Sequence, residues 1–310
     1  MNRRELLAGA LALGAVGASG VGSAAARASL QRLCVTTVCF RDWFAQTPAM
    51  LKSGRPAPRT ITLGEFPQFV ADEFGLGLAE FWSLYFQDLS PAYCRDLKKA
   101  ADRAGVAIAN IQLDNIDADL AAVDEDARMK SLEVVRQWMD RAALLGAPRV
   151  RVNTDIPVAG REFDPDRIAD SYRRLAEYGD KVGVDVLIEN HTGYSVSIKN
   201  VVAIYDRVKH PRCRMCADWG NSPAKDTESR IADLSLMFHG LGFVSAKGVS
   251  FDAEYRHTAY DIASIVRATE ASGYRGIYSV ELFALGKAMP EDPVRAVKSM
   301  IEAIAANLKA

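Results

Sequence analysis

The sequence predicts a single-domain α/β protein, a closed (β/α)8 TIM barrel. Short apolar or β-branched segments alternate eight times with amphipathic helical patterns over residues 29–310. Strict alternation of this kind requires a parallel sheet with helical crossovers. No Gly-x-Gly-x-x-Gly turn follows a predicted strand, and eight units fit a closed barrel better than an open sheet. Because no charged or Pro/Ser-rich linker divides residues 29–310, we assign them to one domain.

The elements follow from local patterns along the chain. Residues 33–38 are β-branched and short, as in a strand, and the proline-rich residues 41–60 predict a loop. Thr62 and Glu65 have the spacing of a capping box at a helix start, and Gly105 and Gly146 stand where helices end. We expect strands at 33–38, 77–81, 106–113, 149–153, 184–189, 213–218, 243–247 and 277–281. We expect helices at 62–74, 91–104, 127–145, 165–182, 198–209, 226–238, 262–271 and 290–308.

Composition and charge limit the class of function. The chain is 49% hydrophobic and 25% charged, which is ordinary for a soluble globular protein. A net charge of −1 argues against a nucleic-acid partner, which usually needs a basic face. Five cysteines do not form a disulfide framework. Cys213 and Cys216 lie within a predicted strand, which favours buried packing over a zinc or redox role.

Residues 1–28 have the composition of an export signal. The pair Arg3-Arg4 precedes a Gly/Ala-rich apolar stretch, and residues 26–28 place alanines at the two positions that a signal peptidase reads. Paired arginines and mild hydrophobicity favour the twin-arginine route over a membrane anchor. We therefore expect a periplasmic protein that meets the membrane only during export, with a mature start near Ser29.

Three carboxylates follow buried strands of the predicted barrel. The apolar run 186–188 ends in Glu189, and Asp218 and Glu281 end two other such segments. Charged groups there are costly unless they meet a ligand, and the C-terminal strand ends of a barrel are where sites are built. Three carboxylates at short range require a cation or a shared proton, and oxygen ligands suit Mg²⁺ or Mn²⁺. Alternatively, each carboxylate pairs with a basic residue, for which Arg151 and Lys247 are candidates.

Four motifs carry a resemblance to a known family: Leu-Gly-Ala-x-x-Val-Arg-Val at 145–152, Leu-Ile-Glu-Asn-His at 187–191, Asp-Trp-Gly-Asn at 218–221 and Ser-Val-Glu at 279–281. In order and spacing they resemble the xylose isomerase-like TIM barrels, the sugar phosphate isomerase/epimerase group. Its members include tagatose and psicose epimerases and inosose dehydratases. The resemblance covers nearly all of residues 29–310. It implies a divalent metal, Mn²⁺ or Mg²⁺, held by Glu189, Asp218 and Glu281, with a fourth ligand, usually histidine, from the seventh strand.

The seventh strand departs from the family pattern. It reads Val-Ser-Ala-Lys at 244–247, so that Ser245 occupies the usual histidine position. A hydroxyl is a much poorer metal ligand than imidazole. Lys247 shares the face of Ser245, and its ammonium group could partly replace the missing cation. We therefore leave open a metal site that is weaker, differently completed or absent.

The resemblance implies a carbohydrate isomerase or epimerase that transfers a proton next to a sugar carbonyl. Removal of a C–H proton leaves an enediolate, which a metal at the barrel mouth would stabilise. Glu189 and Glu281 are the expected bases, and Lys247 would stabilise the developing oxyanion. The expected substrate-binding residues are His191, Asn221, Arg151 and Trp82. The role of Glu80, expected inside the barrel, stays open.

Two alternatives remain. If one carboxylate protonates a leaving group, the same site becomes a lyase or dehydratase acting on keto-sugars or keto-glycosides. The Ser245 departure also allows a non-catalytic periplasmic sugar-binding barrel, although a pure binder has little use for three carboxylates. The endonuclease branch of the superfamily would need further histidine ligands and a basic groove. The expected partner is a small carbohydrate from outside the cell, and the sequence leaves a homo-oligomer open.

Overall fold

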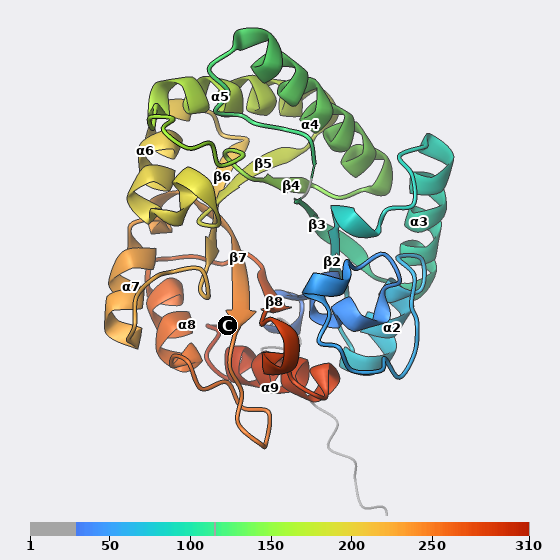
Figure 1. Ribbon diagram of the computed structural model, residues 1–310. Coiled ribbons are helices and arrows are strands. Elements are labelled where there is room, and N and C mark those ends of the chain that lie inside the picture. Colours follow the sequence, from blue (N-terminus) through green and yellow to red (C-terminus); the bar gives the residue numbers. More distant parts are fainter. Residues whose placement is uncertain (1–28, 115, 310) are drawn as a thin grey trace, which may run out of the picture.

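The computed structural model describes residues 29–114 and 116–309 (Figure 1). Eight parallel strands close into a barrel in chain order, which confirms the predicted fold class. The strands are β1 Leu33–Thr36, β2 Leu78–Trp82, β3 Ala107–Leu113, β4 Arg149–Val152, β5 Asp185–Glu189, β6 Cys213–Asp218, β7 Leu241–Gly248 and β8 Tyr278–Leu282. The predicted export signal at 1–28 lies outside the described residues, so export stays a prediction.

Helices surround the ring of strands (Figure 1). They are α2 Phe66–Phe74, α3 Pro91–Ala104, α4 Glu125–Leu145, α5 Pro165–Val182, α6 Ile198–Val208, α7 Thr227–Ser235, α8 Ile262–Ala271 and α9 Pro293–Ala305. The helix expected at 62–74 begins at Phe66 instead of Thr62. Glu65 Oε2 accepts hydrogen bonds from the Thr62 amide and hydroxyl at 2.9 and 2.7 Å, which holds this pair in a turn ahead of the helix. None of the described helices is both long and apolar enough to span a bilayer.

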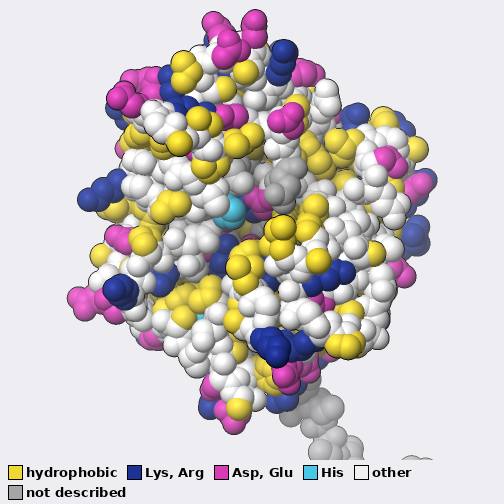
Figure 2. All heavy atoms as spheres, in the orientation of Figure 1, with side chains coloured by type: hydrophobic (Ala, Val, Ile, Leu, Met, Phe, Trp, Pro, Cys, Tyr) yellow, Lys and Arg dark blue, Asp and Glu magenta, His cyan; other side chains and the backbone are white. Residues whose placement is uncertain are grey.

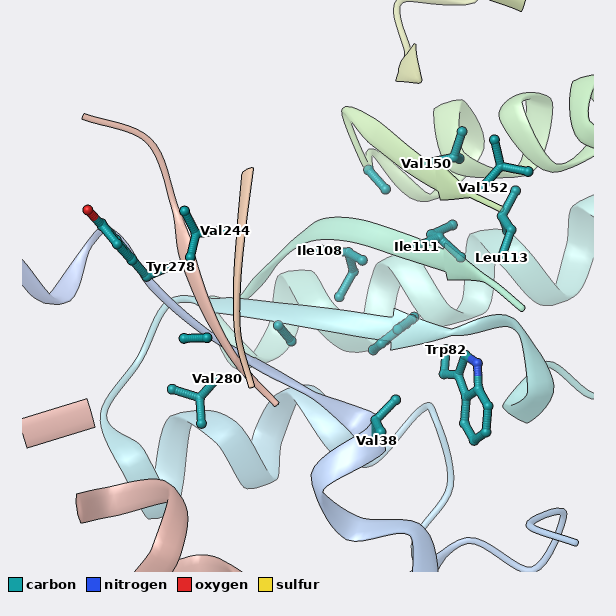
Figure 3. Packing of buried hydrophobic residues seen from close by; sticks show 14 of the residues in the cluster. Val38, Trp82, Ile108, Ile111, Leu113, Val150, Val152, Val244, Tyr278 and Val280 are labelled. Atoms are coloured by element: carbon teal, nitrogen blue, oxygen red, sulfur yellow. The ribbon is translucent and has the colours of Figure 1, made fainter. Parts of the chain in front are cut away.

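The face seen in Figure 2 is hollowed near its centre, where basic, acidic and histidine side chains are visible among hydrophobic ones. The main apolar core lies between the strands and the helices, and Figure 3 shows part of it. Ile111 and Val150 pair across β3 and β4, as do Leu113 and Val152. All four are buried, and burial of each such side chain stabilises the fold by about 1.5–3 kcal/mol.

A second, smaller apolar cluster consists of Cys34, Ala109, Leu187, Cys216 and Phe243. Leu187 is two residues before Glu189, and Cys216 is two residues before Asp218, so that each pair shares one face of its strand. The apolar cluster therefore lies inside the barrel, directly below the strand-end carboxylates. The described cysteines are free and buried, and Cys213 and Cys216 lie within β6, as the sequence predicts.

Candidate active site

The predicted carboxylates meet at the C-terminal ends of the strands. Glu189 ends β5, Asp218 ends β6 and Glu281 lies near the end of β8. Strand β7 runs between β6 and β8, so that Ser245 pairs with Asp218 and Lys247 pairs with Glu281. All five side chains are buried. The closed barrel thus brings together residues that lie almost 100 positions apart in the sequence.

Asn190 fixes the position of Asp218. Its side-chain oxygen accepts a hydrogen bond from the Asp218 amide at 2.8 Å, and its amide nitrogen donates to the Asp218 carbonyl at 2.9 Å. The Asp218 carboxylate in turn accepts a hydrogen bond from the Asn221 backbone at 2.8 Å. The Glu-Asn pair of the 187–191 motif therefore supplies one buried carboxylate and one side chain that holds the end of the next strand.

Lys247 occupies the centre of the site. Its Nζ lies 2.9 Å from Asp218 Oδ2 and 3.0 Å from Glu281 Oε1, and it donates to Asn221 Oδ1 at 3.0 Å. A lysine ammonium has three N–H donors, and all three have an acceptor here. Burial alone would lower the pKa of Lys247, but Asp218 and Glu281 outweigh it and raise that pKa above its ordinary value. These contacts therefore favour the charged form of Lys247.

Arg151 forms a second ionic group at the mouth. Its guanidinium binds both oxygens of Asp114, at 2.8 and 2.9 Å, and lies 2.8 Å from Glu189 Oε2. Trp82 Nε1 and Asn153 Nδ2 also donate to Asp114, each at 2.9 Å. Burial would raise the pKa of Asp114, but Arg151 holds it well below its usual range. The ionised Asp114 therefore fixes the positions of the Arg151, Trp82 and Asn153 side chains.

The environments of Glu189 and Glu281 differ. Glu189 Oε2 is buried and accepts no hydrogen bond from the described residues, although Arg151 is near. Burial, reinforced by Asp218, raises the pKa of Glu189. Glu281 accepts a hydrogen bond from Gln112 at 2.8 Å and contacts Lys247. Burial would raise the pKa of Glu281, but the positive charges of Lys247 and Arg151 lower it. The two carboxylates are thus pushed toward opposite protonation states.

The predicted substrate-binding residues have unequal surroundings. Arg151 and Trp82 are buried and engaged with Asp114, whereas His191 is half-buried at the rim. Burial lowers the pKa of His191 to about 4, which makes this imidazole neutral near pH 7. Asn221 Nδ2 is buried without a hydrogen-bond partner among the described residues. Substrate binding by these four residues stays a prediction.

Sequence reasoning missed two contributors to the site. Asp114 carries the same signal as the predicted carboxylates, because it directly follows a buried strand. Gln112 gives no such signal, since an amide inside a strand is not distinctive. It links β1 to the site by accepting a hydrogen bond from Thr36 Oγ1 at 3.1 Å while donating to Glu281.

The arrangement does not fit the divalent metal that the sequence resemblance implies. In the part of the chain that is described, no three His, Cys, Asp or Glu side chains are placed to hold a metal ion. The Lys247 ammonium lies between Asp218 and Glu281, and the Arg151 guanidinium lies against Glu189. A divalent ion on these oxygens would meet both positive charges at close range.

Glu80 is buried in the barrel interior and forms no ion pair with the described residues. Asn110 Nδ2 donates to Glu80 Oε1 at 2.6 Å, and Ser279 Oγ donates to Oε2 at 2.5 Å. Burial raises the pKa of Glu80 from 4.5 to about 7. Between these two pH values the folded protein therefore holds a proton that the unfolded chain releases.

This difference predicts a pH-dependent stability. The contribution of Glu80 to the free energy of unfolding is full below pH 4.5 and is lost as pH rises through about 7. We expect wild type to lose up to about 3 kcal/mol relative to Glu80→Gln across this range. Urea unfolding of both proteins at a series of pH values measures the difference. A difference that does not change with pH would contradict the assignment.

Comparison with known proteins places the fold. The model of the family described as xylose isomerase-like TIM barrel matches residues 70–305. A D-allulose 3-epimerase from Methylomonas sp. superposes with a TM-score of 0.69 at 15% identity, covering 89% of this chain and 98% of that one. A D-psicose 3-epimerase from Clostridium cellulolyticum H10 gives 0.68 at 14%, covering 90% and 100%. A 3-keto-D-glucoside 4-epimerase from E. coli gives 0.62 at 15%, covering 89% and 99%. At these identities the structural likeness establishes the fold alone.

Proposed function

The chain belongs to the xylose isomerase-like TIM barrel family, and on that premise we propose that it is a carbohydrate isomerase or epimerase. It would transfer a proton at the carbon next to a sugar carbonyl. The observation that carries the proposal is the presence of two buried carboxylates at one barrel mouth, Glu281 in contact with the ammonium of Lys247 and Glu189 beside the guanidinium of Arg151. The epimerases among the similar structures act on ketoses or a keto-glucoside, which supports the substrate class.

The reaction uses one carboxylate on each face of the substrate. The ionised carboxylate removes the proton from the carbon, and the electron pair of the C–H bond forms a C=C bond while the carbonyl oxygen becomes an oxyanion. Lys247 stabilises that oxyanion through an N–H donor, which is effective in a buried site of low dielectric. The oxyanion then re-forms the carbonyl, and the electron pair of the C=C bond takes a proton from the protonated carboxylic acid on the other face, giving the epimer. Exchange with solvent restores the starting protonation states.

Solvent exchange tests this function directly. The mature protein is incubated in D₂O with keto-sugars and with 3-keto-glucosides, and the products are followed by NMR. We expect deuterium at the carbon next to the carbonyl, together with the epimer or isomer. An unsaturated or deoxygenated product would identify a lyase instead. Saturable sugar binding without any exchange would identify a non-catalytic binding protein and overturn the proposal.

The location and partner of the protein are further parts of the proposal. We propose that residues 1–28 direct export by the twin-arginine route and that a small carbohydrate from outside the cell is the ligand. The paired arginines Arg3-Arg4 support this route. Replacing both by lysine is expected to retain the unprocessed chain in the cytoplasm, as measured by fractionation and immunoblotting. Unchanged periplasmic recovery of the variant would contradict the twin-arginine assignment. Homo-oligomerisation stays a prediction.

A further inference from the structure

We propose that Lys247 replaces the divalent metal in this chain, so that its ammonium group is the electrophile of the site. The inference rests on the proposed function for its chemistry. Two of the carboxylates expected to ligate a metal, Asp218 and Glu281, both contact Lys247 Nζ at 2.9 and 3.0 Å. The third acceptor is Asn221 Oδ1 at 3.0 Å. Lys247 Nζ thus contacts the carboxylate oxygen atoms that a metal ion would otherwise bind.

Packing holds Lys247 in this position. A Cβ atom built on Gly220 would lie 2.8 Å from Lys247 Cγ and 2.9 Å from Cδ, which is closer than real Cβ atoms approach other groups. Only glycine at this place in the Asp-Trp-Gly-Asn motif leaves room for the lysine stem. The ammonium also lies 5.3 Å from the centre of the Phe283 ring, within cation–π range. Lys247 is only 4% exposed, so its ammonium is enclosed by protein groups at the position where an ion would bind.

Ser245 completes the substitution. Its Oγ donates a hydrogen bond to Asp218 Oδ2 at 2.9 Å, so that a proton points at the same carboxylate oxygen that contacts Lys247. An imidazole at this position would offer a metal a lone pair, whereas this hydroxyl uses its hydrogen to bind Asp218. The serine therefore fits a site built around an ammonium ion and fits a metal site poorly.

All three N–H donors of Lys247 already have acceptors, and Asn221 is the acceptor that a substrate can displace. It is the only neutral acceptor among the three partners of Lys247 in the described site, so its hydrogen bond is the weakest of the three. A substrate oxyanion that takes its place gains a charge-assisted bond, while Asp218 and Glu281 keep the ammonium in position. The unpaired Asn221 Nδ2 is then available as a donor to a neighbouring hydroxyl.

The experiment measures metal content and needs no substrate. Wild type is produced in medium containing Mn²⁺, Mg²⁺ and Zn²⁺, purified without chelator and subjected to elemental analysis and melting with each ion or EDTA. We expect substoichiometric metal and no shift in melting temperature. The double variant Ser245→His/Lys247→Met supplies the missing imidazole and removes the ammonium. We expect it to bind one Mn²⁺ per chain, with a melting shift that EDTA reverses.

A stoichiometric ion in wild type that is lost in Asp218→Asn would overturn the inference. This measurement of the wild-type protein does not depend on whether a variant folds. Failure of the inference about Lys247 can be distinguished from failure of the proposed function. A metal-bound wild type that still exchanges substrate deuterium overturns the lysine inference alone. A metal-free protein without exchange overturns the proton-transfer function, and with it the electrophile role, whereas the replacement of the metal by Lys247 stands.

Discussion

Replacing Glu281 by glutamine is expected to lower the rate of substrate epimerisation by about 10²–10⁴-fold, the usual contribution of a positioned acid or base. Glutamine retains the shape of the side chain and an oxygen for Lys247, but it cannot accept or return the proton. Glu189→Gln is expected to cause a loss of the same order. The measurement is the initial rate of epimer formation and of deuterium incorporation, followed by NMR.

A two-base site makes a sharper prediction for the same variants. The carboxylate that remains can still exchange the proton of the one epimer that it faces. We therefore expect Glu189→Gln and Glu281→Gln to retain partial deuterium exchange with opposite epimers while both lose interconversion. Glu80→Gln is the matched control, because Glu80 is a buried carboxylate of the same barrel that contacts Asn110 and Ser279 instead of the site cations. Wild-type interconversion in either site variant would remove that carboxylate from the mechanism.

The sequence predicts the barrel and its carboxylates because both depend on local order. A buried strand between two helices is recognisable from its apolar run, and the residue that ends it must lie at the common mouth. Glu189, Asp218 and Glu281 are found in this way, and all three are buried at that end of the barrel. The period of two along a strand also places Lys247 on the face of Ser245. None of these inferences requires knowledge of a partner on another strand.

The partners themselves cannot be read from the sequence. Arg151 and Trp82 are apparent as polar or aromatic groups at strand ends, a pattern that predicts substrate binding. In the structure both donate hydrogen bonds to Asp114, from the strand between them. Likewise, the sequence places Lys247 near the carboxylates, but the contact with Gly220 and the acceptor on Asn221 depend on how β6 and β7 pack. The register of neighbouring strands, and the choice among several nearby acceptors, decide which partner each charged side chain contacts.

The Arg151 cluster leads to the largest expected change in stability. Arg151 is 2% exposed and serves two buried carboxylates, Asp114 and Glu189. Its replacement by methionine fills the volume but leaves the ionised Asp114 without its cation and removes the group that lies against Glu189. We expect the free energy of unfolding near pH 7 to fall by about 3–5 kcal/mol, the typical cost of removing one partner from a buried ion pair. Urea unfolding followed by tryptophan fluorescence measures this loss.

Acidification separates this electrostatic cause from simple loss of packing. In wild type, Arg151 holds the pKa of Asp114 below its ordinary 3.8, so this carboxylate adds stability above that pH and loses it as pH falls. Without the guanidinium that gain is absent, and the deficit of Arg151→Met should shrink as the pH falls below 3.8. Arg149→Met is the matched control on the same strand, because Arg149 donates to the Ala109 carbonyl at 3.2 Å and has no carboxylate partner among the described residues. That control should cost only about 1 kcal/mol at every pH. Equal losses in the two variants would show that the pairing of Arg151 with Asp114 and Glu189 does not stabilise the barrel mouth.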